Sequence, residues 1–250
     1  DGGLDGDLGT AGDNATFSRT FGVTVNVVND TPTLNALSDL TIDEDVSEQT
    51  VNLASITAGG GESQPLRVTA SSSSTGLIPN PTVTYTSANA TGSIAFTPVT
   101  DQSGTATITV TVEDGGLDNN LSTAGDNATF SRTFDVTVNA SNDAPTLDAL
   151  SNLSIVEDAS EQTVNLAGIN AGGGESQPLR VTASSSSTGL IPNPTVTYTS
   201  ANATGSIAFT PVTDQSGTAT ITVTVEDGGL DNNLSTAGDN ATFSRTFDVT

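Results

Sequence analysis

The sequence predicts an all-β protein made of tandem seven-stranded sandwiches, and three observations support this prediction. The segment Asp-Gly-Gly-Leu-Asp begins at Asp1, Asp114 and Asp227, so the chain of 250 residues repeats with a period of 113 residues. Short runs alternate apolar and polar residues, as strands with one buried face do. Clusters of Gly, Pro, Asn and Asp separate these runs and indicate turns. The period fits one autonomous domain and is too long for a solenoid unit.

The strongest strand prediction covers Gly104 to Glu113, in which Val and Ile alternate with Thr. Its apolar side chains face one way and its hydroxyl groups the other, which indicates a sheet with one dry face. A second strand is predicted from Ala128 to Asn139, with Phe and Val in phase. Arg132 interrupts that phase, and we expect either an edge position or a β-bulge there.

Five shorter runs bring the predicted strands of a repeat to seven. They are Thr33 to Asp39, Thr50 to Leu53, Leu66 to Ala70, Thr82 to Thr86 and Ser93 to Thr97. Strands of this length with turns between them are typical of a Greek-key β-sandwich. The chain has no Cys and no Trp, so the disulfide-and-tryptophan core of an antibody domain is not expected.

The repeat also divides the chain into domains. Residues 58–137 are identical to residues 171–250. We predict one complete repeat at 30–142 and a second at 143–250, whose last strand is nearly complete. Residues 1–29 are then the C-terminal strand of a truncated preceding repeat, and we expect the sandwiches to lie end to end.

The charge of the chain is strongly unbalanced, with 29 acidic and five basic residues and a net charge of -24. Nucleic acid is not expected as a partner, because binding phosphate requires a basic surface. The acidity either keeps a secreted protein soluble or serves to hold a hard divalent cation. No apolar run is long enough to span a membrane. No signal peptide is found, but Asp1 lies inside a repeat, so export signals would lie outside this sequence.

The composition gives catalysis no support. The chain lacks His, Cys and Lys, and hydrolysis by paired acids would require a cleft rather than repeated turn residues. Near-identical repetition instead points to length, valency or stiffness. We predict that the protein is not an enzyme.

Three segments at the end of the repeat resemble the cadherin-like or immunoglobulin-like tandem repeats of large bacterial surface proteins of the adhesin type. They are Thr107 to Gly116 (TITVTVEDGG), Phe130 to Asn139 (FSRTFDVTVN) and the linker Asn142 to Thr146 (NDAPT). The linker pattern recurs as NDTPT from Asn29 to Thr33. The resemblance covers the whole unit and implies a cadherin-like sandwich located outside the cell or on its surface.

The resemblance also implies Ca²⁺ at the junctions between successive repeats, where cadherins bind it. Carried over by position, the candidate ligands at the junction within this chain are Glu44, Asp45, Asp101, Asn139, Asn142, Asp143 and Asp227, with Glu226 beside the last. The corresponding candidates for neighbouring junctions are Asn26, Asn29, Asp30, Glu113, Asp114, Glu157, Asp158 and Asp214. Their carboxylate and amide oxygens suit Ca²⁺, which takes about six to eight oxygen ligands.

The sequence departs from the family pattern in ways that lower the expected number of ions. Asn139 and Asn142 stand where the family linker has acids, and Gln102 stands where a second acid precedes the penultimate strand. The loop from Gly59 to Glu62 has one carboxylate in place of an Asp-x-Asp motif. We therefore expect one or two Ca²⁺ ions per junction.

Each candidate ligand also has a simpler structural interpretation. Asp30 and Asp143 lie just before a Pro, where an Asp side chain commonly bonds its own backbone in a turn. Asp114 begins a hairpin-type sequence, Asp-Gly-Gly. Glu44 and Asp45 would fit a solvated strand end. The sequence leaves both interpretations open.

Two functions agree with these observations. The first is a structural extender or stalk of an extracellular bacterial surface or matrix protein, whose partners are the neighbouring repeats and whose junctions Ca²⁺ makes rigid. The alternative is an adhesion or self-assembling fibre module that pairs with other copies or binds a cell-surface glycan. The run Thr16 to Val27 favours a fibre, because a strand without its own sheet can complete another. No aromatic platform for sugar stacking is visible, which weakens the glycan version.

Overall fold

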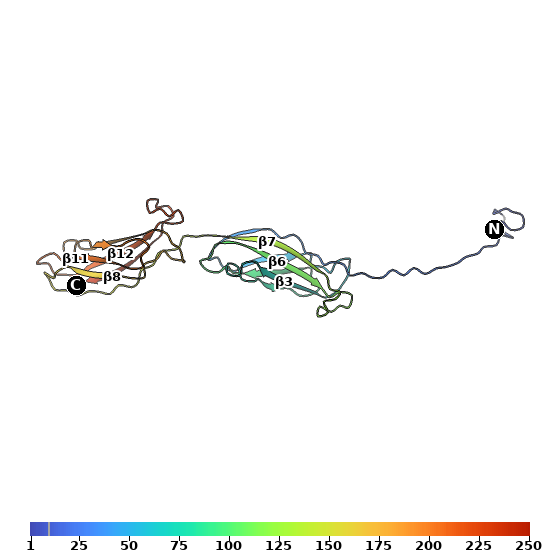
Figure 1. Ribbon diagram of the computed structural model, residues 1–250, viewed down its shortest axis with the longest axis horizontal. Coiled ribbons are helices and arrows are strands. Elements are labelled where there is room, and N and C mark those ends of the chain that lie inside the picture. Colours follow the sequence, from blue (N-terminus) through green and yellow to red (C-terminus); the bar gives the residue numbers. More distant parts are fainter. Residues whose placement is uncertain (10) are drawn as a thin grey trace.

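The fold is all-β. A computed structural model describes residues 1–9 and 11–250 of the chain, and these residues form thirteen strands and no helix. This part of the chain therefore has no helix that is long and apolar enough to cross a membrane. Figure 1 shows two sandwiches arranged end to end, with the N-terminal segment running away from the first.

The first repeat contains seven strands in two sheets, as predicted. One sheet has the order β1 (Leu40–Asp43), β7 (Thr129–Asn139), β6 (Gly104–Asp114), β3 (Leu66–Ser72). The other has the order β2 (Gln49–Ala54), β5 (Thr91–Phe96), β4 (Thr82–Thr84). All neighbours are antiparallel except β1 and β7, which pair in parallel. The predicted class of tandem β-sandwiches is confirmed.

The second repeat has the same sheets with one strand less. One sheet has the order β13 (Thr242–Val249), β12 (Ala219–Asp227), β9 (Leu179–Ser185). The other has the order β10 (Thr195–Thr197), β11 (Gly205–Phe209), β8 (Gln162–Leu166). At the place of β1 the second repeat forms a single parallel bridge between Leu153 and Val249. The hydrogen bonds at this place run from Leu153 N–H to the Asp248 carbonyl at 2.8 Å and from Thr250 N–H to the Leu153 carbonyl at 3.0 Å.

Each repeat has its own hydrophobic core, formed by alternate residues of both sheets. On β6 the inward side chains of Ala106, Ile108, Val110 and Val112 are completely buried, as the alternation predicts. Burying a Val or Ile side chain stabilises a fold by roughly 1.5–3 kcal/mol relative to leaving it exposed. The two cores are separate clusters, so each repeat supplies its own folding free energy.

Two details of the predicted strands need correction. The strand predicted from Thr33 to Asp39 is wrong, since β1 begins at Leu40 and Thr33 makes only an isolated bridge to Thr57. The Asp39 carboxylate accepts the backbone N–H of Asp135 at 2.8 Å, so a side chain replaces strand pairing at that point.

The predicted alternative of a β-bulge at Arg132 is also wrong, because the register of β6 and β7 is unbroken. The edge alternative holds for this half of β7, since β1 pairs only with Val136–Asn139. Arg132 places its guanidinium over the Phe130 ring, 4.8 Å from its centroid, and donates to the Leu34 carbonyl at 3.3 Å. The arginine thus covers the end of the core without leaving the strand.

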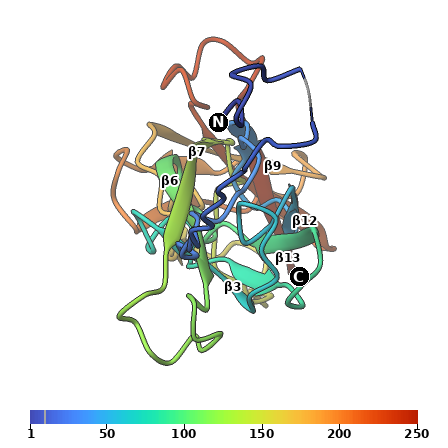
Figure 2. The same ribbon diagram turned by 90° about the vertical axis from the view of Figure 1, so that its right-hand side faces the viewer.

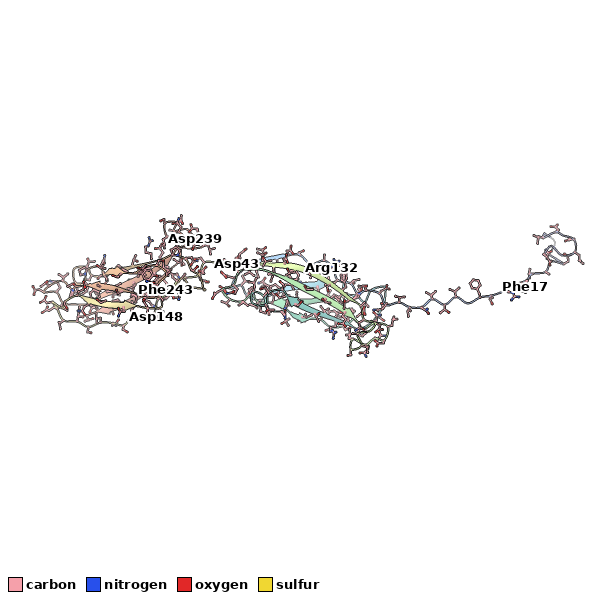
Figure 3. The ribbon with its side chains drawn as sticks, viewed as in Figure 1. Phe17, Asp43, Arg132, Asp148, Asp239 and Phe243 are labelled. Carbon is pink, nitrogen blue, oxygen red and sulfur yellow. The ribbon has the colours of Figure 1, made fainter. Side chains whose placement is uncertain are left out.

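The predicted strand from Thr16 to Val27 has no strand partner among the described residues. Its apolar side chains are exposed, with Phe21 at 88% and Val25 at 88% of their full exposure. Figure 3 shows Phe17 on this extended segment, away from both sandwiches. Its assignment to a preceding repeat stays a prediction.

The long loop between the last two strands shows how the repeats are turned. It covers residues 115–128 in the first repeat and 228–241 in the second. Seen along the long axis in Figure 2, the two loops project on opposite sides of the molecule. Successive repeats are therefore rotated about the axis as well as translated along it.

Candidate cation site between the repeats

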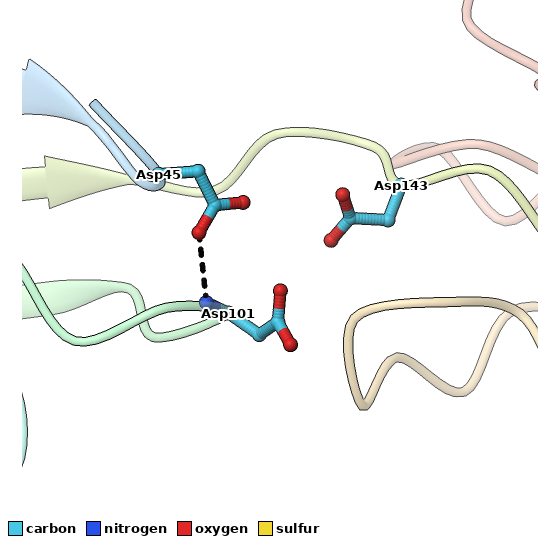
Figure 4. Close-up of side chains that lie close together, drawn as sticks. All are labelled: Asp45, Asp101 and Asp143. Atoms are coloured by element: carbon cyan, nitrogen blue, oxygen red, sulfur yellow. Dashed lines mark hydrogen bonds between the residues drawn. The ribbon is translucent and has the colours of Figure 1, made fainter. Parts of the chain in front are cut away.

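Three predicted ligands meet where the first repeat ends and the second begins. Asp45 follows β1, Asp101 precedes β6, and Asp143 belongs to the linker. One carboxylate oxygen from each lies within 4.8 Å of those from the other two (Figure 4). The structure thus brings together side chains that are far apart in the sequence and that come from both sides of the junction.

Backbone conformation fixes the two acids of the first repeat. Asp45 and Asp101 both have left-handed φ angles, 62° and 57°, a region that Asp tolerates better than most residues. The backbone N–H of Asp101 donates to Asp45 Oδ1 at 3.1 Å, which is the dashed line in Figure 4. This bond holds the two carboxylates on one side of the site.

The second repeat holds Asp143 from the other side. Its backbone N–H donates to Glu175 Oε2 at 3.1 Å. Its Oδ2 atom is buried and meets no hydrogen-bond donor among the described residues. A buried carboxylate oxygen without a donor is costly unless a cation or a proton compensates its charge.

Glu44 fastens the linker to the first repeat. The residue is buried, and its Oε1 accepts the backbone N–H of Ser141 at 2.7 Å. Its own N–H donates to the Asn139 carbonyl at 2.9 Å. Asn139 turns its side-chain amide to Asp43 Oδ1 at 3.1 Å, on the end of β1, and Figure 3 shows Asp43 at this end of the first repeat.

The electrostatics of the junction are repulsive. Burial raises the pKa of Asp143 above its ordinary value, and the carboxylates of Asp101, Asp45, Glu175 and Glu44 raise this pKa further. The ion pairs between described residues, Arg67–Glu113 and Arg180–Glu226, include none of these five acids. Five carboxylates therefore face one another without a paired side-chain cation.

Asn142 and Asp227 do not join the acid cluster. Together with Gln177 they form a separate hydrogen-bonded group, which we call the buried amide network. The Asn142 amide donates to Asp227 Oδ1 at 3.0 Å and to the Asp239 carbonyl at 2.9 Å, and its oxygen accepts from Gln177 at 2.8 Å. Asp227 is completely buried, and its Oδ1 also accepts two backbone N–H groups of the β12–β13 loop. Nitrogen donors thus satisfy Asp227 Oδ1 and the Asn142 oxygen, whereas Asp227 Oδ2 and Gln177 Oε1 are buried and meet no donor among the described residues.

The first repeat contains the same network, made by Asn29, Gln64 and Asp114. Asn29 donates to Asp114 Oδ1 at 3.0 Å and accepts from Gln64 at 2.7 Å. Asn29 and Asp114, predicted as ligands for a neighbouring junction, therefore bond to each other. Glu113 and Glu226 instead pair with an arginine on the outer face of their repeats.

The remaining predicted ligands lie at the two far ends of the sandwiches. The Asp214 N–H donates to Asp158 Oδ1 at 3.0 Å, which repeats the pairing of Asp101 with Asp45. Asp30 donates its N–H to Glu62 Oε2 at 3.2 Å, which repeats the pairing of Asp143 with Glu175. Glu157 is exposed next to Asp158. Asn26 is exposed on the extended N-terminal segment.

Sequence reasoning missed Glu175 as a member of the junction. Its loop reads Gly-Gly-Gly-Glu and looks poor in ligands, but the glycines bring the backbone against the linker. The signal that could have identified Glu175 is its position as the single acid directly after three glycines.

The arrangement suits a hard cation. Oxygens bound to one Ca²⁺ lie about 2.3–2.6 Å from it, so they are at most about 5 Å apart. The three grouped carboxylates meet that limit, and the buried Oδ2 of Asp143 supplies an oxygen that lacks another partner. The residues present therefore fit a Ca²⁺ ion.

The fold and the junction together define a tandem pair of β-sandwich repeats joined by a short linker that carries Asp143. The family model described as bacterial Ig domain matches residues 142–242, which cover most of the second repeat. Residues 58–137 of the first repeat are identical to residues 171–250, so the two repeats share most of the sequence that the family model matches. The resemblance found in the sequence is thereby confirmed.

Several solved structures are similar at low sequence identity. The titin domains Z1Z2, solved in complex with telethonin, are 14% identical with a TM-score of 0.33, and the match covers 90% of this chain and 98% of that chain. Protocadherin gamma B2 extracellular cadherin domains 3–6 are 12% identical with a TM-score of 0.40, covering 89% and 51%. Domains 4 and 5 of the S-layer protein SbsC are 17% identical with a TM-score of 0.30, covering 73% and 70%. Curated protein sequences give no match.

Proposed function

We propose that this chain is part of a structural extender of an extracellular bacterial protein, in which Ca²⁺ at the junction fixes the angle between successive repeats. The observation that carries the proposal is the meeting of Asp45, Asp101 and Asp143, contributed from both sides of the junction. A cation shared by the three carboxylates would convert their repulsion into a link between the repeats.

The residues have separate roles in this proposal. Asp45 and Asp101 form the half of the site that belongs to the first repeat, and Asp143 forms the half that belongs to the second. Glu44 holds the linker backbone through Ser141, and Glu175 holds Asp143. One ion at the three grouped carboxylates is the expected stoichiometry for this junction.

The extender role is supported by the repetition itself. Each sandwich would add roughly 35 Å, about ten strand residues at ~3.3 Å each, to the length of an array. The match to a bacterial Ig domain and the net charge of -24 agree with a location outside the cell. A stalk made of such units would carry whatever lies at its tip away from the surface.

Spin labels provide a direct test, because the chain has no cysteine of its own. Cysteines introduced at the exposed positions Thr133 and Thr246 would carry one label on each repeat. With Ca²⁺ the distribution of distances between the labels should be narrow, and with EDTA it should broaden. The same distribution in both conditions would remove the cation from the mechanism.

A matched pair of variants sharpens the test. Asp101→Asn should abolish the effect of Ca²⁺ on the label distances. Asp214→Asn makes the same change at the equivalent position of the second repeat, away from the junction, and should leave the effect intact.

The second candidate function, a self-assembling fibre or adhesion module, is favoured by one observation. Residues 16–26 have the sequence of β7 except for Gly22 in place of Asp135, and their apolar side chains are exposed. Such a segment would pair with a sheet that has an open edge, in a preceding repeat or in another copy. Sedimentation at several concentrations tests the second case, and a strictly monomeric chain would count against it.

A further inference from the structure

A loop of three glycines lies against the linker in both repeats. Gly172, Gly173 and Gly174 have φ angles of 94°, 41° and 74°, all in the left-handed region. A Cβ atom on Gly173 would lie 1.9 Å from Asp143 Oδ2, and one on Gly172 would lie 2.4 Å from the Ala144 carbonyl oxygen. The loop backbone therefore approaches the linker more closely than any side chain would permit.

Hydrogen bonds hold the loop in this shape. The Glu175 N–H donates to the Gly172 carbonyl at 2.8 Å and closes the turn. The Gly172 N–H donates to Asn170 Oδ1 at 2.9 Å. Glu175 then accepts the N–H of Asp143, so the loop and the linker aspartate are joined directly.

The first repeat has the same arrangement around Asp30, which belongs to no group of three acids among the described residues. A Cβ atom on Gly60 would lie 1.8 Å from Asp30 Oδ2, and Glu62 closes the turn on Gly59 at 2.8 Å. The counterparts of Asp45 and Asp101 for this end would precede Asp1 and are not in the sequence. The aspartate is thus held in the same way with or without the other half of the site.

The other half of the site is also independent of its partner. Asp214 bonds to Asp158 at 3.0 Å at the far end of the second repeat, as Asp101 bonds to Asp45 at 3.1 Å at the junction. Asp158 and Asp214 have φ angles of 62° and 55°, close to those of Asp45 and Asp101.

We infer that the loop Gly172–Gly174 is a positioning element, which seats Asp143 before any cation arrives, so that each repeat presents a preformed half-site at each end. The part of this inference that concerns Ca²⁺ affinity rests on the proposed function, whereas the seating of the aspartate does not. A preformed site binds more tightly because the ligands lose little further freedom on binding.

The test compares alanine substitutions at neighbouring glycines in the complete chain. Gly173→Ala places a methyl group on the Asp143 carboxylate and should displace it. Gly174→Ala is the matched control, because Gly174 also has a left-handed φ but a Cβ there meets nothing within 4 Å. Gly60→Ala makes the same collision at Asp30 and tests whether a repeat tolerates the substitution.

Two measurements are made on each variant. Hydrogen exchange of the Asp143 amide, followed by NMR in EDTA, reports the seating without a cation. Gly173→Ala should lose the protection that the wild type, Gly174→Ala and Gly60→Ala retain. Calorimetric titration with Ca²⁺ should show an affinity lowered by ~10–100-fold in Gly173→Ala, the usual loss when a group that orients a metal ligand is changed, and little change in both controls.

The outcomes separate the two proposals. Equal exchange of the Asp143 amide in Gly173→Ala and Gly174→Ala would overturn the seating role. If the wild type binds no Ca²⁺, the proposed function fails, and the exchange measured in EDTA still decides whether the glycine loop seats the aspartate. Loss of protection in Gly173→Ala with unchanged Ca²⁺ affinity would overturn the link between seating and binding.

Discussion

The acid cluster of Asp45, Asp101 and Asp143 and the buried amide network of Asn142, Gln177 and Asp227 meet at adjoining linker residues, Asp143 and Asn142, but their carboxylates have different neighbours. In the network, amide and backbone N–H groups donate to Asp227 Oδ1 at 2.9–3.0 Å, while its Oδ2 is buried without a donor. In the cluster, carboxylates face carboxylates, and the only bond drawn between them in Figure 4 comes from a backbone N–H. Adjacent linker residues, Asn142 and Asp143, therefore serve different purposes.

The difference teaches which acids a single cation can bridge, because Asp227 Oδ2 also lacks a donor but Asp227 belongs to no group of three acids among the described residues. An oxygen that already accepts two or three N–H donors gains little from a metal, and removing it leaves those donors unsatisfied. An oxygen that faces other oxygens gains most from a metal and contributes repulsion without one. We expect the network to determine stability at every Ca²⁺ concentration, and the cluster to determine it only when Ca²⁺ is present.

The largest effect is expected from Asp227→Ala, which tests the network side of the comparison. The change leaves the N–H groups of Gly229 and Ala241 and the Asn142 amide without their acceptor, and should cost about 3 kcal/mol. Calorimetry should show the second repeat melting in a separate transition roughly 12–24 °C below the first. The cost should be the same in Ca²⁺ and in EDTA, and dependence on Ca²⁺ would contradict a purely structural role.

Asp143→Asn tests the cluster side. At free Ca²⁺ of 100 times Kd, binding should stabilise the wild type by about 2.7 kcal/mol, and the variant should lose this gain. In EDTA the variant should be as stable as the wild type or slightly more stable, because a repelling charge is removed. Thermal unfolding in both conditions measures this difference.

Asp30→Asn is the matched control for Asp143→Asn, since Asp30 has the same glycine loop but is grouped with no other acids among the described residues. It should leave the stabilisation by Ca²⁺ unchanged. An equal loss in both variants would show that the ion binds to the linker of each repeat and not to the junction.

The pH dependence of Ca²⁺ binding should be governed by Asp143. Its pKa in the folded protein is raised above the ordinary value of 3.8, so protons compete with Ca²⁺ at a higher pH than at an unperturbed aspartate. Without Ca²⁺ the raised pKa also means that the ionised carboxylate is less stable in the folded protein than in the unfolded chain. The contribution of Asp143 to the free energy of unfolding is therefore lost as pH rises from the unfolded pKa through the folded pKa. Calorimetric titrations should show affinity falling by up to about tenfold per pH unit below that pKa.

The smallest effect is expected from Arg67→Ala, which removes a salt bridge at the exposed surface. The Arg67 side chain is 51% exposed and that of Glu113 is 18% exposed, so solvent screens their attraction. The arginine lowers the pKa of Glu113, chiefly through its hydrogen bond, so the pair contributes above the ordinary carboxyl pKa and is lost as pH falls. We expect a loss of less than about 1 kcal/mol in chemical denaturation, independent of Ca²⁺.

The strands could be predicted from the sequence because their alternation reports directly which face is buried. Ile108 and Val110 alternate with threonines, and each lies where the pattern places it. The first strand was misplaced because Asp39 satisfies a backbone N–H of β7 with its side chain, and no periodicity marks such a substitution. The two copies are identical over residues 58–137 and 171–250, so a strand pattern found in one repeat predicts the same strand in the other.

The candidate site could be predicted only in part. Position in the chain identified Asp45, Asp101 and Asp143, which the structure brings together. Position did not show that Asn142 turns its amide inward to Asp227, because the direction of a side chain depends on the backbone of the linker. It also did not show Glu175, whose place depends on three consecutive left-handed glycines.

The parallel pairing of β1 with β7 has a mechanical consequence for a molecule pulled at its two ends. The first and last strands of the repeat run side by side, joined from Leu40↔Val136 to Asp43↔Asn139. Tension then pulls the two strands in opposite directions along their own axes, so all of the hydrogen bonds between them are loaded at the same moment. In a hairpin pulled at its open end, the hydrogen bonds would instead break one pair at a time. We therefore expect the short strand β1 to set the force at which the first sandwich yields.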